Sequence, residues 1–179
     1  MAEYFDVLDD KGIKTGETKL RTEVHRDGDW HKEVYVWIVN DKNEILLQKR
    51  SPAKIDNPNM WDISVGGHVV AGNGSLDTAI QEIKEELDID ISESEIQFVG
   101  TLKSARKHTE TFINNSFGDI YLYRLPRDIN NLKLQEDEVS EVKYFSIPEL
   151  KDMIARKDPT FLMHLAGYCE MLFDALNQT

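Results

Sequence analysis

The chain has 179 residues, 40% hydrophobic and 30% charged, which suits one compact domain and excludes collagen-like and wholly disordered chains. Its single cysteine excludes an internal disulfide. With 33 acidic residues against 21 Lys and Arg, the net charge of −12 disfavours nucleic acid polymers and membranes as partners.

The N-terminal region predicts a short strand and a turn. Residues 4–8 are a strand candidate, residues 9–12 predict the turn of a hairpin, and a loop is expected at 26–29 within the mostly polar stretch 16–32. The first ten residues have neither the basic nor the apolar region of a signal peptide, and no apolar run reaches the roughly 20 residues of a membrane helix. We therefore expect a cytoplasmic protein, and the sequence leaves monomer or homodimer open.

The middle of the chain predicts a buried hairpin followed by a helix. Residues 34–39 (VYVWIV) are continuously apolar, as in a strand buried on both faces, and 44–48 run back beside them. Residues 75–87 predict the clearest helix, with Ser75 as its N-cap. Its apolar residues recur at helical spacing, at positions 76, 79, 80, 83 and 87.

The remaining elements complete a fold of mixed type. We expect strands at 96–102, 111–113, 119–125 and 142–145, and helices at 148–155 and 160–176. Strands and helices mix without regular β–α–β alternation, which predicts an α+β class. We expect a domain at 30–157, an N-terminal strand or hairpin extension packed on it at 1–29, and a C-terminal helix of the same domain at 158–179.

The predicted helix at 75–87 carries an acidic cluster. Glu82, Glu85 and Glu86 stand at i, i+3 and i+4, so their side chains converge on a face opposite the apolar stripe, exposed or lining a cleft. Hard oxygen ligands of this kind select Mg²⁺ or Mn²⁺. A solvated acidic face is the alternative for such a run, but the glycine pair at 66–67 allows close backbone approach to a ligand.

Residues 67–89, GHVVAGNGSLDTAIQEIKEELDI, resemble the 23-residue Nudix box, G-x5-E-x7-R-E-U-x-E-E-x-G-U. Gly67, the EIKEE run at 82–86 and Ile89 match it. Further resemblance to the subgroup nearest isopentenyl-diphosphate isomerase lies at 31–40, 46–50, 61–69 and 139–145. This resemblance to the Nudix (MutT-like) hydrolase family implies an α/β/α sandwich with a mixed β-sheet.

The resemblance also implies a chemistry. Family members hydrolyse diphosphates with Mg²⁺ held by box carboxylates, which implies Glu82, Glu85 and Glu86 as catalytic metal ligands. The Gly67 carbonyl is a further expected metal ligand, and Arg50 is expected to bind the substrate phosphate. The implied function is Mg²⁺- or Mn²⁺-dependent hydrolysis of a diphosphate linkage in a nucleoside diphosphate derivative or a similar small metabolite.

Several positions depart from the family pattern. Asn73 replaces the first Glu of the box, Gln81 the Arg, and Asp88 the Gly, while Ser116 stands where the subgroup often has Glu. The loss of the Arg predicts a poorly oriented acidic cluster. Glu110 is then the nearest other candidate for a general base, although an ordinary loop carboxylate is the simpler interpretation.

Two alternatives remain open. In an isomerase-like protein the catalytic Cys would fall at Gly66, which cannot transfer a proton, so this alternative is disfavoured. His31 and His68 match metal-binding imidazoles of the isomerase, and His25 lies nearby. Without Glu at 114 or 116 such a site would lack oxygen ligands, which favours surface or hydrogen-bonded histidines. The second alternative is a catalytically weak Nudix module that only binds a ligand.

Overall fold

The computed structural model describes residues 2–54, 56–126, 129 and 132–177. The strands are β1 (Tyr4–Leu8), β2 (Lys14–Leu20), β3 (Trp30–Val39), β4 (Ile45–Arg50), β5 (Trp61–Asp62), β6 (Val65–His68), β7 (Ile96–Thr109), β8 (Phe112–Arg124) and β9 (Val139–Phe145). The helices are α1 (Arg21–Asp27), α2 (Ser75–Leu87), α3 (Ile147–Ala155) and α4 (Ala166–Asn177), with short 3₁₀ turns at Glu93–Glu95 and Met163–Leu165. No helix within these ranges is long and apolar enough to cross a membrane.

Strand β3 organises a mixed sheet. It runs parallel to β8 over its whole length, from Trp30 opposite Asn115 to Val39 opposite Arg124. It is antiparallel to β6 and, at its far end, to β4. The antiparallel strand β1 joins β3 to β2, so the N-terminal hairpin extends the same sheet.

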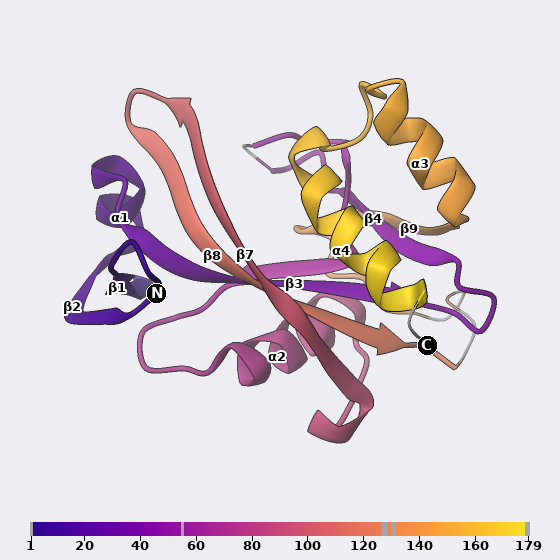
Figure 1. Cartoon of the computed structure of the whole chain (residues 1–179), viewed down its shortest axis with the longest axis horizontal. Helices are drawn as coiled ribbons and strands as arrows, with labels where there is room; N and C mark the ends of the chain where they lie inside the picture. Colours follow the sequence, from indigo (N-terminus) through magenta and orange to yellow (C-terminus); the bar gives the residue numbers. More distant parts are fainter. Residues whose placement is uncertain (1, 55, 127–128, 130–131, 178–179) are drawn as a thin grey trace.

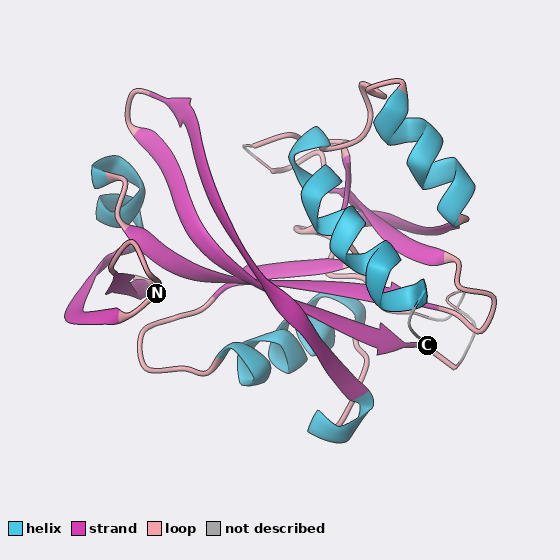
Figure 2. Ribbon diagram, in the orientation of Figure 1, coloured by secondary structure: helices cyan, strands magenta, loops and turns pink. Residues whose placement is uncertain are grey.

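The sheet separates two cores, because successive side chains of β3 point to opposite faces. Val34, Val36 and Ile38 face α2, whereas Tyr35 and Trp37 face α3 and α4. Figure 1 shows α2 below the sheet and α3 and α4 above it, and Figure 2 shows the same layers coloured as helix and strand. The expected α+β fold, a Nudix-type α/β/α sandwich with a mixed sheet, is therefore confirmed.

Helix α2 buries the predicted stripe. Ala79, Ile83 and Leu87 are fully buried against the sheet. The N-cap is Gly74 rather than Ser75, whose hydroxyl instead pairs with Tyr121 at 2.8 Å. The helix ends at a left-handed residue, as the box pattern requires, but Asp88 occupies that position with φ 53° in place of Gly.

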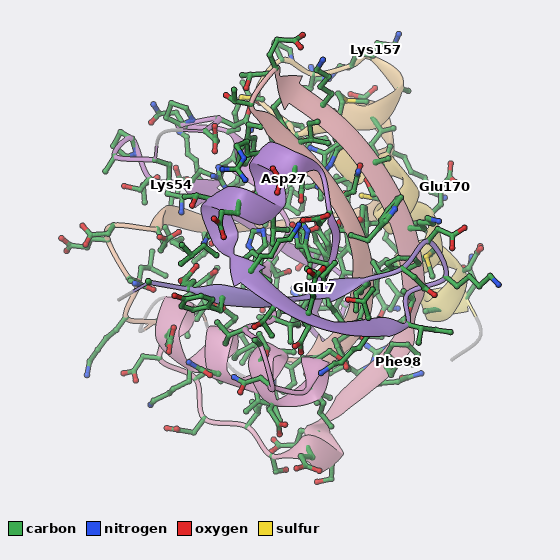
Figure 3. All side chains as sticks on the ribbon, turned by 90° about the vertical axis from the view of Figure 1, so that its left-hand side faces the viewer. Glu17, Asp27, Lys54, Phe98, Lys157 and Glu170 are labelled. Atoms are coloured by element: carbon green, nitrogen blue, oxygen red, sulfur yellow. The ribbon has the colours of Figure 1, made fainter. Side chains whose placement is uncertain are left out.

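Two other expectations were wrong about local structure. The loop expected at 26–29 begins later, because residues 26 and 27 belong to α1, which ends at Gly28 in the left-handed conformation. The short strands expected between 96 and 125 are one long hairpin, β7–β8, which rises beyond the sheet (Figure 1). Polar alternation hid its length, because one face of this hairpin is solvated. Figure 3 looks onto the N-terminal side, where α1, with Asp27, lies in front of the sheet.

Candidate functional site

A cavity of about 390 Å³ lies where β3, β6, α1, α2 and β7 meet. Its lining contains the acidic residues of α2, the glycine pair, two histidines of the N-terminal half, two of the C-terminal half and several cations. These residues are Glu82, Glu85, Glu86, Gly66, Gly67, His25, His68, Glu33, Glu138, Arg21, Arg50, Lys54, Arg106, His108 and His164, among others. The helix carboxylates therefore line a cleft, as one of the two sequence interpretations held.

The carboxylates of α2 differ sharply in burial. Glu86 is only 4% exposed, although it was placed on the face opposite the apolar stripe, while Glu82 is half-buried and Glu85 exposed. Burial, followed by the charges of Glu85 and Glu138, raises the pKa of Glu82 to about 7. Burial and the same kind of repulsion, from Glu82 and Glu138, hold the pKa of Glu86 well above its ordinary value. The Arg21 charge lowers the pKa of Glu82 in part, but no cation among the described residues forms an ion pair with Glu82 or Glu86.

The glycine at 67 has a steric role. A Cβ added there would lie 2.3 Å from Oε1 of Glu82, so the carboxylate packs directly on the Gly67 backbone. At Gly66 an added Cβ would meet Ile63 at 3.4 Å, an ordinary contact. Only the second glycine is required for the acidic cluster to form.

The residues fit a hard divalent cation. Among the described residues, Oε2 of Glu86 is buried without a hydrogen-bond partner, and so is Oε1 of Gln48, whose side chain lies against Glu86. Burying unpaired oxygens and adjacent carboxylates is costly, and a cation among them removes both costs. Glu82, Glu86 and Gln48 thus offer a set of hard oxygen donors.

The substituted box positions lie outside this cavity. Gln81 is exposed and donates a 2.7 Å hydrogen bond to Glu85, the most exposed of the three carboxylates. It therefore orients Glu85 without neutralising it. Asn73 is exposed in the turn before α2 and does not line the cavity.

Three histidines form a second cluster, of which two, His25 and His68, line the cavity. The ligand atoms of His25, His31 and His68 all lie within 4.8 Å of one another. His25 and His31 are buried, whereas His68 keeps one-fifth of its side chain exposed. Phe5 stacks on His68 and His31, at centroid distances of 5.0 and 5.4 Å, and fixes both rings.

Hydrogen bonds assign the imidazole tautomers in this cluster. Nδ1 of His25 lies 2.7 Å from the Arg21 carbonyl, and Nδ1 of His31 lies 3.1 Å from the Asp29 carbonyl. A carbonyl only accepts, so each Nδ1 is protonated and each Nε2 carries a lone pair. Both Nε2 atoms are buried without a hydrogen-bond partner in the part of the chain that the structure describes. Burial lowers the pKa of all three histidines, which keeps them neutral.

Glu33 of β3 supplies the oxygen atoms of this cluster. Its Oε1 lies 3.2 Å from Nε2 of His68, and it accepts hydrogen bonds from Tyr35 and Asn114. Burial alone would raise the pKa of Glu33, but His68, His31, the Ser116 hydroxyl and the Arg106 charge together lower it. Of the expected surface or hydrogen-bonded histidines, His25 and His31 are hydrogen-bonded and buried. The oxygen beside the cluster, which was not expected, comes from Glu33 of β3 and not from position 114 or 116.

Comparisons with known proteins identify the family. The family model described as NUDIX domain matches residues 29–165. The chain belongs to the Nudix hydrolase family. It is 40% identical to Nudix hydrolase 3 of Arabidopsis thaliana over 98% of its own length, but spans only 23% of that protein. An uncharacterized Nudix hydrolase of Clostridium acetobutylicum is 35% identical, over 87% of this chain and 75% of the relative.

A solved structure confirms the Nudix fold. The crystal structure of DR0079 from Deinococcus radiodurans superimposes with a TM-score of 0.72 at 22% sequence identity. The alignment covers 94% of this chain and 98% of that one. At this sequence identity the likeness shows a shared fold, and a shared fold does not by itself show a shared reaction.

Arg50, the expected phosphate-binding residue, and Glu110, the candidate general base, have other surroundings than a role in the site would need. Arg50 lines the cavity, but its Nη1 lies 2.9 Å from Asp62 and its other nitrogens donate to the Asp56 carbonyl. Glu110 lies at the exposed tip of the β7–β8 hairpin, its side chain 90% exposed, and pairs with Lys107. Glu110 is therefore outside the cavity, since the strands continue further than the sequence indicated.

Sequence reasoning missed other residues of the cavity. Glu138 lies just before β9, is close enough to raise the pKa of Glu82 and Glu86, and forms an ion pair with Lys54, labelled in Figure 3. Arg106 of β7 also lines the cavity. The connection between β8 and β9 brings Glu138 to the site, and the long β7–β8 hairpin brings Arg106. No local sequence pattern marks either residue.

The structure offers no thiol for isomerase chemistry. Cys169, the single cysteine, is fully buried in α4, on the sheet face opposite α2. Burial raises the pKa of its thiol to about 12. Cys169 is inert and cannot replace the residue missing at Gly66.

Proposed function

We propose that this Nudix hydrolase cleaves a diphosphate linkage in a nucleoside diphosphate derivative or similar small metabolite, with Mg²⁺ or Mn²⁺. The observation that supports it best is the buried Glu86 carboxylate beside Glu82 in the cavity lining, with one oxygen that has no hydrogen-bond partner among the described residues. Proteins rarely bury adjacent carboxylates unless a cation or a proton joins them. The acidic chain also needs a cation to accept a phosphate compound.

The proposed ligands are Glu82, Glu85 and Glu86, with the Gly67 carbonyl. Glu86 and Glu82 would hold the cation inside the cavity, and Glu85 would hold it from the exposed rim. When bound, Mg²⁺ or Mn²⁺ neutralises phosphate charge and lowers the pKa of a water molecule. In the reaction, the water oxygen attacks one phosphorus, the bridging P–O bond breaks, and the second phosphate leaves with that oxygen.

Glu138 is the proposed proton acceptor for the attacking water. Its side chain is 38% exposed, so it remains accessible, and it lines the cavity together with Glu82 and Glu86, where its ion pair with Lys54 holds it in place. Glu82 and Glu86 are more deeply placed and are assigned to the cation instead. This assignment replaces Glu110, which is remote from the cavity.

The test is a phosphate-release screen with Mg²⁺ or Mn²⁺. The substrates are nucleoside diphosphates, nucleotide sugars, ADP-ribose, dinucleoside polyphosphates and prenyl diphosphates. We expect metal-dependent turnover of at least one class, lost in Glu86→Gln. If nothing is hydrolysed but a nucleotide binds, the chain is a Nudix binding module and the proposed hydrolysis is wrong.

The histidine cluster supports a second cation site in the same cavity. Three neutral imidazoles with a carboxylate alongside suit Zn²⁺, Ni²⁺, Co²⁺ or Mn²⁺ better than Mg²⁺. Carbonyl partners on Nδ1 already orient two of the rings. Metal content of the purified protein tests this site: His31→Ala should lower it, whereas His108→Ala, with an exposed imidazole, should not.

A further inference from the structure

Arg106 is the least neutralised cation of the cavity. Its side chain projects from β7, is 17% exposed and lines the cavity. Within the described residues, its one hydrogen bond runs from Nη2 to the Tyr35 hydroxyl at 3.3 Å, while Nε is buried with no partner. A guanidinium has five N–H donors, so most of its donor capacity is unused.

The other cations of the cavity are already paired. Arg21 lies 2.7 Å from Glu3, Arg50 lies 2.9 Å from Asp62, and Lys54 contacts Glu138. Each of these contacts must be broken or shared before the cation can bind a ligand. Arg106 faces no such competition at short range, which singles it out.

The carboxylate nearest Arg106 does not satisfy it. Nη2 of Arg106 lies 3.8 Å from Oε2 of Glu33, beyond hydrogen-bond distance. That oxygen already accepts a 2.9 Å bond from Tyr35, and Oε1 accepts one from Asn114. Glu33 therefore keeps its hydrogen bonds to Tyr35 and Asn114 if Arg106 turns to an entering anion. At 3.8 Å, the Glu33 carboxylate neutralises the positive charge of Arg106 only in part.

A continuous set of contacts links Arg106 to the acidic cluster. Arg106 lies beside Glu33, Glu33 beside His68, and the next residue, Gly67, carries the Glu82 carboxylate on its backbone. All of these residues line the one cavity. A diphosphate bound at the carboxylates through a cation would thus have a guanidinium with unused donors in the same cavity.

We propose that Arg106 binds the phosphate of the diphosphate that is not held at the α2 carboxylates. This inference rests on the proposed function, and it replaces the sequence-based assignment of phosphate binding to Arg50. The planar guanidinium suits two phosphate oxygens at once, and an anion would satisfy the buried Nε. Arg106 thereby makes the site selective for diphosphates over monophosphates.

The test uses imidodiphosphate, whose P–N–P bridge resists hydrolysis, titrated calorimetrically with Mg²⁺ present. We expect Arg106→Gln to weaken binding about tenfold or more, and Arg106→Lys less, since Lys keeps the charge without the fork. Lys107→Gln removes the same charge from the neighbouring position, where Lys107 pairs with Glu110 in solvent, and should bind like wild type. Inorganic phosphate should bind equally to all four proteins.

The outcomes separate this inference from the proposed function. If wild type hydrolyses a diphosphate but Arg106→Gln retains both its KM and its imidodiphosphate affinity, the role of Arg106 is overturned and hydrolysis stands. If no diphosphate is hydrolysed but Arg106→Gln still loses affinity and Lys107→Gln does not, the anion site stands and the proposed function fails. Equal loss in Arg106→Gln and Lys107→Gln would also overturn the inference, as an effect of net charge alone.

Discussion

The acidic cluster of α2 and the histidine cluster of α1, β3 and β6 respond to burial in opposite ways. Burial raises the pKa of Glu82 and Glu86, so the carboxylates tend to hold protons near neutrality. Burial lowers the pKa of His25, His31 and His68, so the imidazoles hold no extra proton. A cation must displace protons from the first cluster and none from the second.

The two clusters therefore depend on their surroundings in different ways. The acidic cluster is unstable as a set of charges and needs a ligand, whereas the histidine cluster is already neutral and held by stacking and carbonyl contacts. We therefore expect variants of the acidic cluster to alter activity and pH dependence. Variants of the histidine cluster should instead alter metal content and packing.

The largest effect is expected from Glu86→Gln. The amide keeps the shape but removes the buried charge that holds the cation, and turnover should fall by about two orders of magnitude or more. Without metal, the variant should be more stable than wild type, because Gln removes a buried carboxylate that Glu82 and Glu138 repel. Kinetics and thermal melts check both, with Glu170→Gln on α4 as the exposed control.

Gly67→Ala should have the next largest effect. The new Cβ would meet Oε1 of Glu82 at 2.3 Å, so the carboxylate must move and metal affinity should fall about tenfold to a hundredfold. Gly66→Ala is the matched control, since its Cβ makes only ordinary contacts. Equal metal affinities in the two variants would show that Glu82 does not depend on the close approach.

The pH dependence of stability distinguishes the clusters. The pKa of Glu82 is raised from 4.5 to about 7, so the folded state binds more protons than the unfolded state between these values. The contribution of Glu82 to stability is thus present below pH 4.5 and is lost as pH rises to 7. Metal-free wild type should lose stability relative to Glu82→Gln across this window, and saturating Mg²⁺ should abolish the loss. Chemical denaturation at several pH values measures it.

The smallest effect concerns the altered box. Gln81→Arg would place a cation beside the exposed Glu85, and we expect turnover to rise by no more than a few-fold. Asn73→Glu should change nothing, because position 73 is exposed and does not line the cavity. A large gain from Asn73→Glu would show that the turn before α2 folds over the site during the reaction.

Much of this architecture could be predicted from the sequence, because strong periodic signals carry it. The apolar run at 34–39 and the stripe of α2 specified the central strand and the helix beneath it, and the spacing of Glu82, Glu85 and Glu86 placed the acidic face. Burial of Glu86 could not be predicted, since it depends on β4 and on the loop at 135–138 packing over the helix.

The resemblance singled out His31 and His68, with His25 nearby, but the buried geometry of the histidine cluster and the position of Arg106 were beyond local sequence reasoning for a similar reason. His25 belongs to a short helix hidden in a polar stretch, and it meets His68 only because β6 pairs with β3. Arg106 reaches the cavity only because β7 continues past the sheet. Both depend on contacts between residues distant in the chain, which no single-segment pattern encodes.

The central claim is that the α2 carboxylates hold a catalytic cation apart from the histidines, and Mn²⁺ calorimetry tests it most directly. Wild type, Glu82→Gln with Glu86→Gln, and His31→Ala are titrated at neutral pH, and phosphate release is measured on the same samples. We predict that the double Gln variant loses one class of Mn²⁺ site together with turnover, while His31→Ala keeps that site. Unchanged Mn²⁺ binding in the double Gln variant, or loss of the turnover-linked site in His31→Ala alone, would contradict the account.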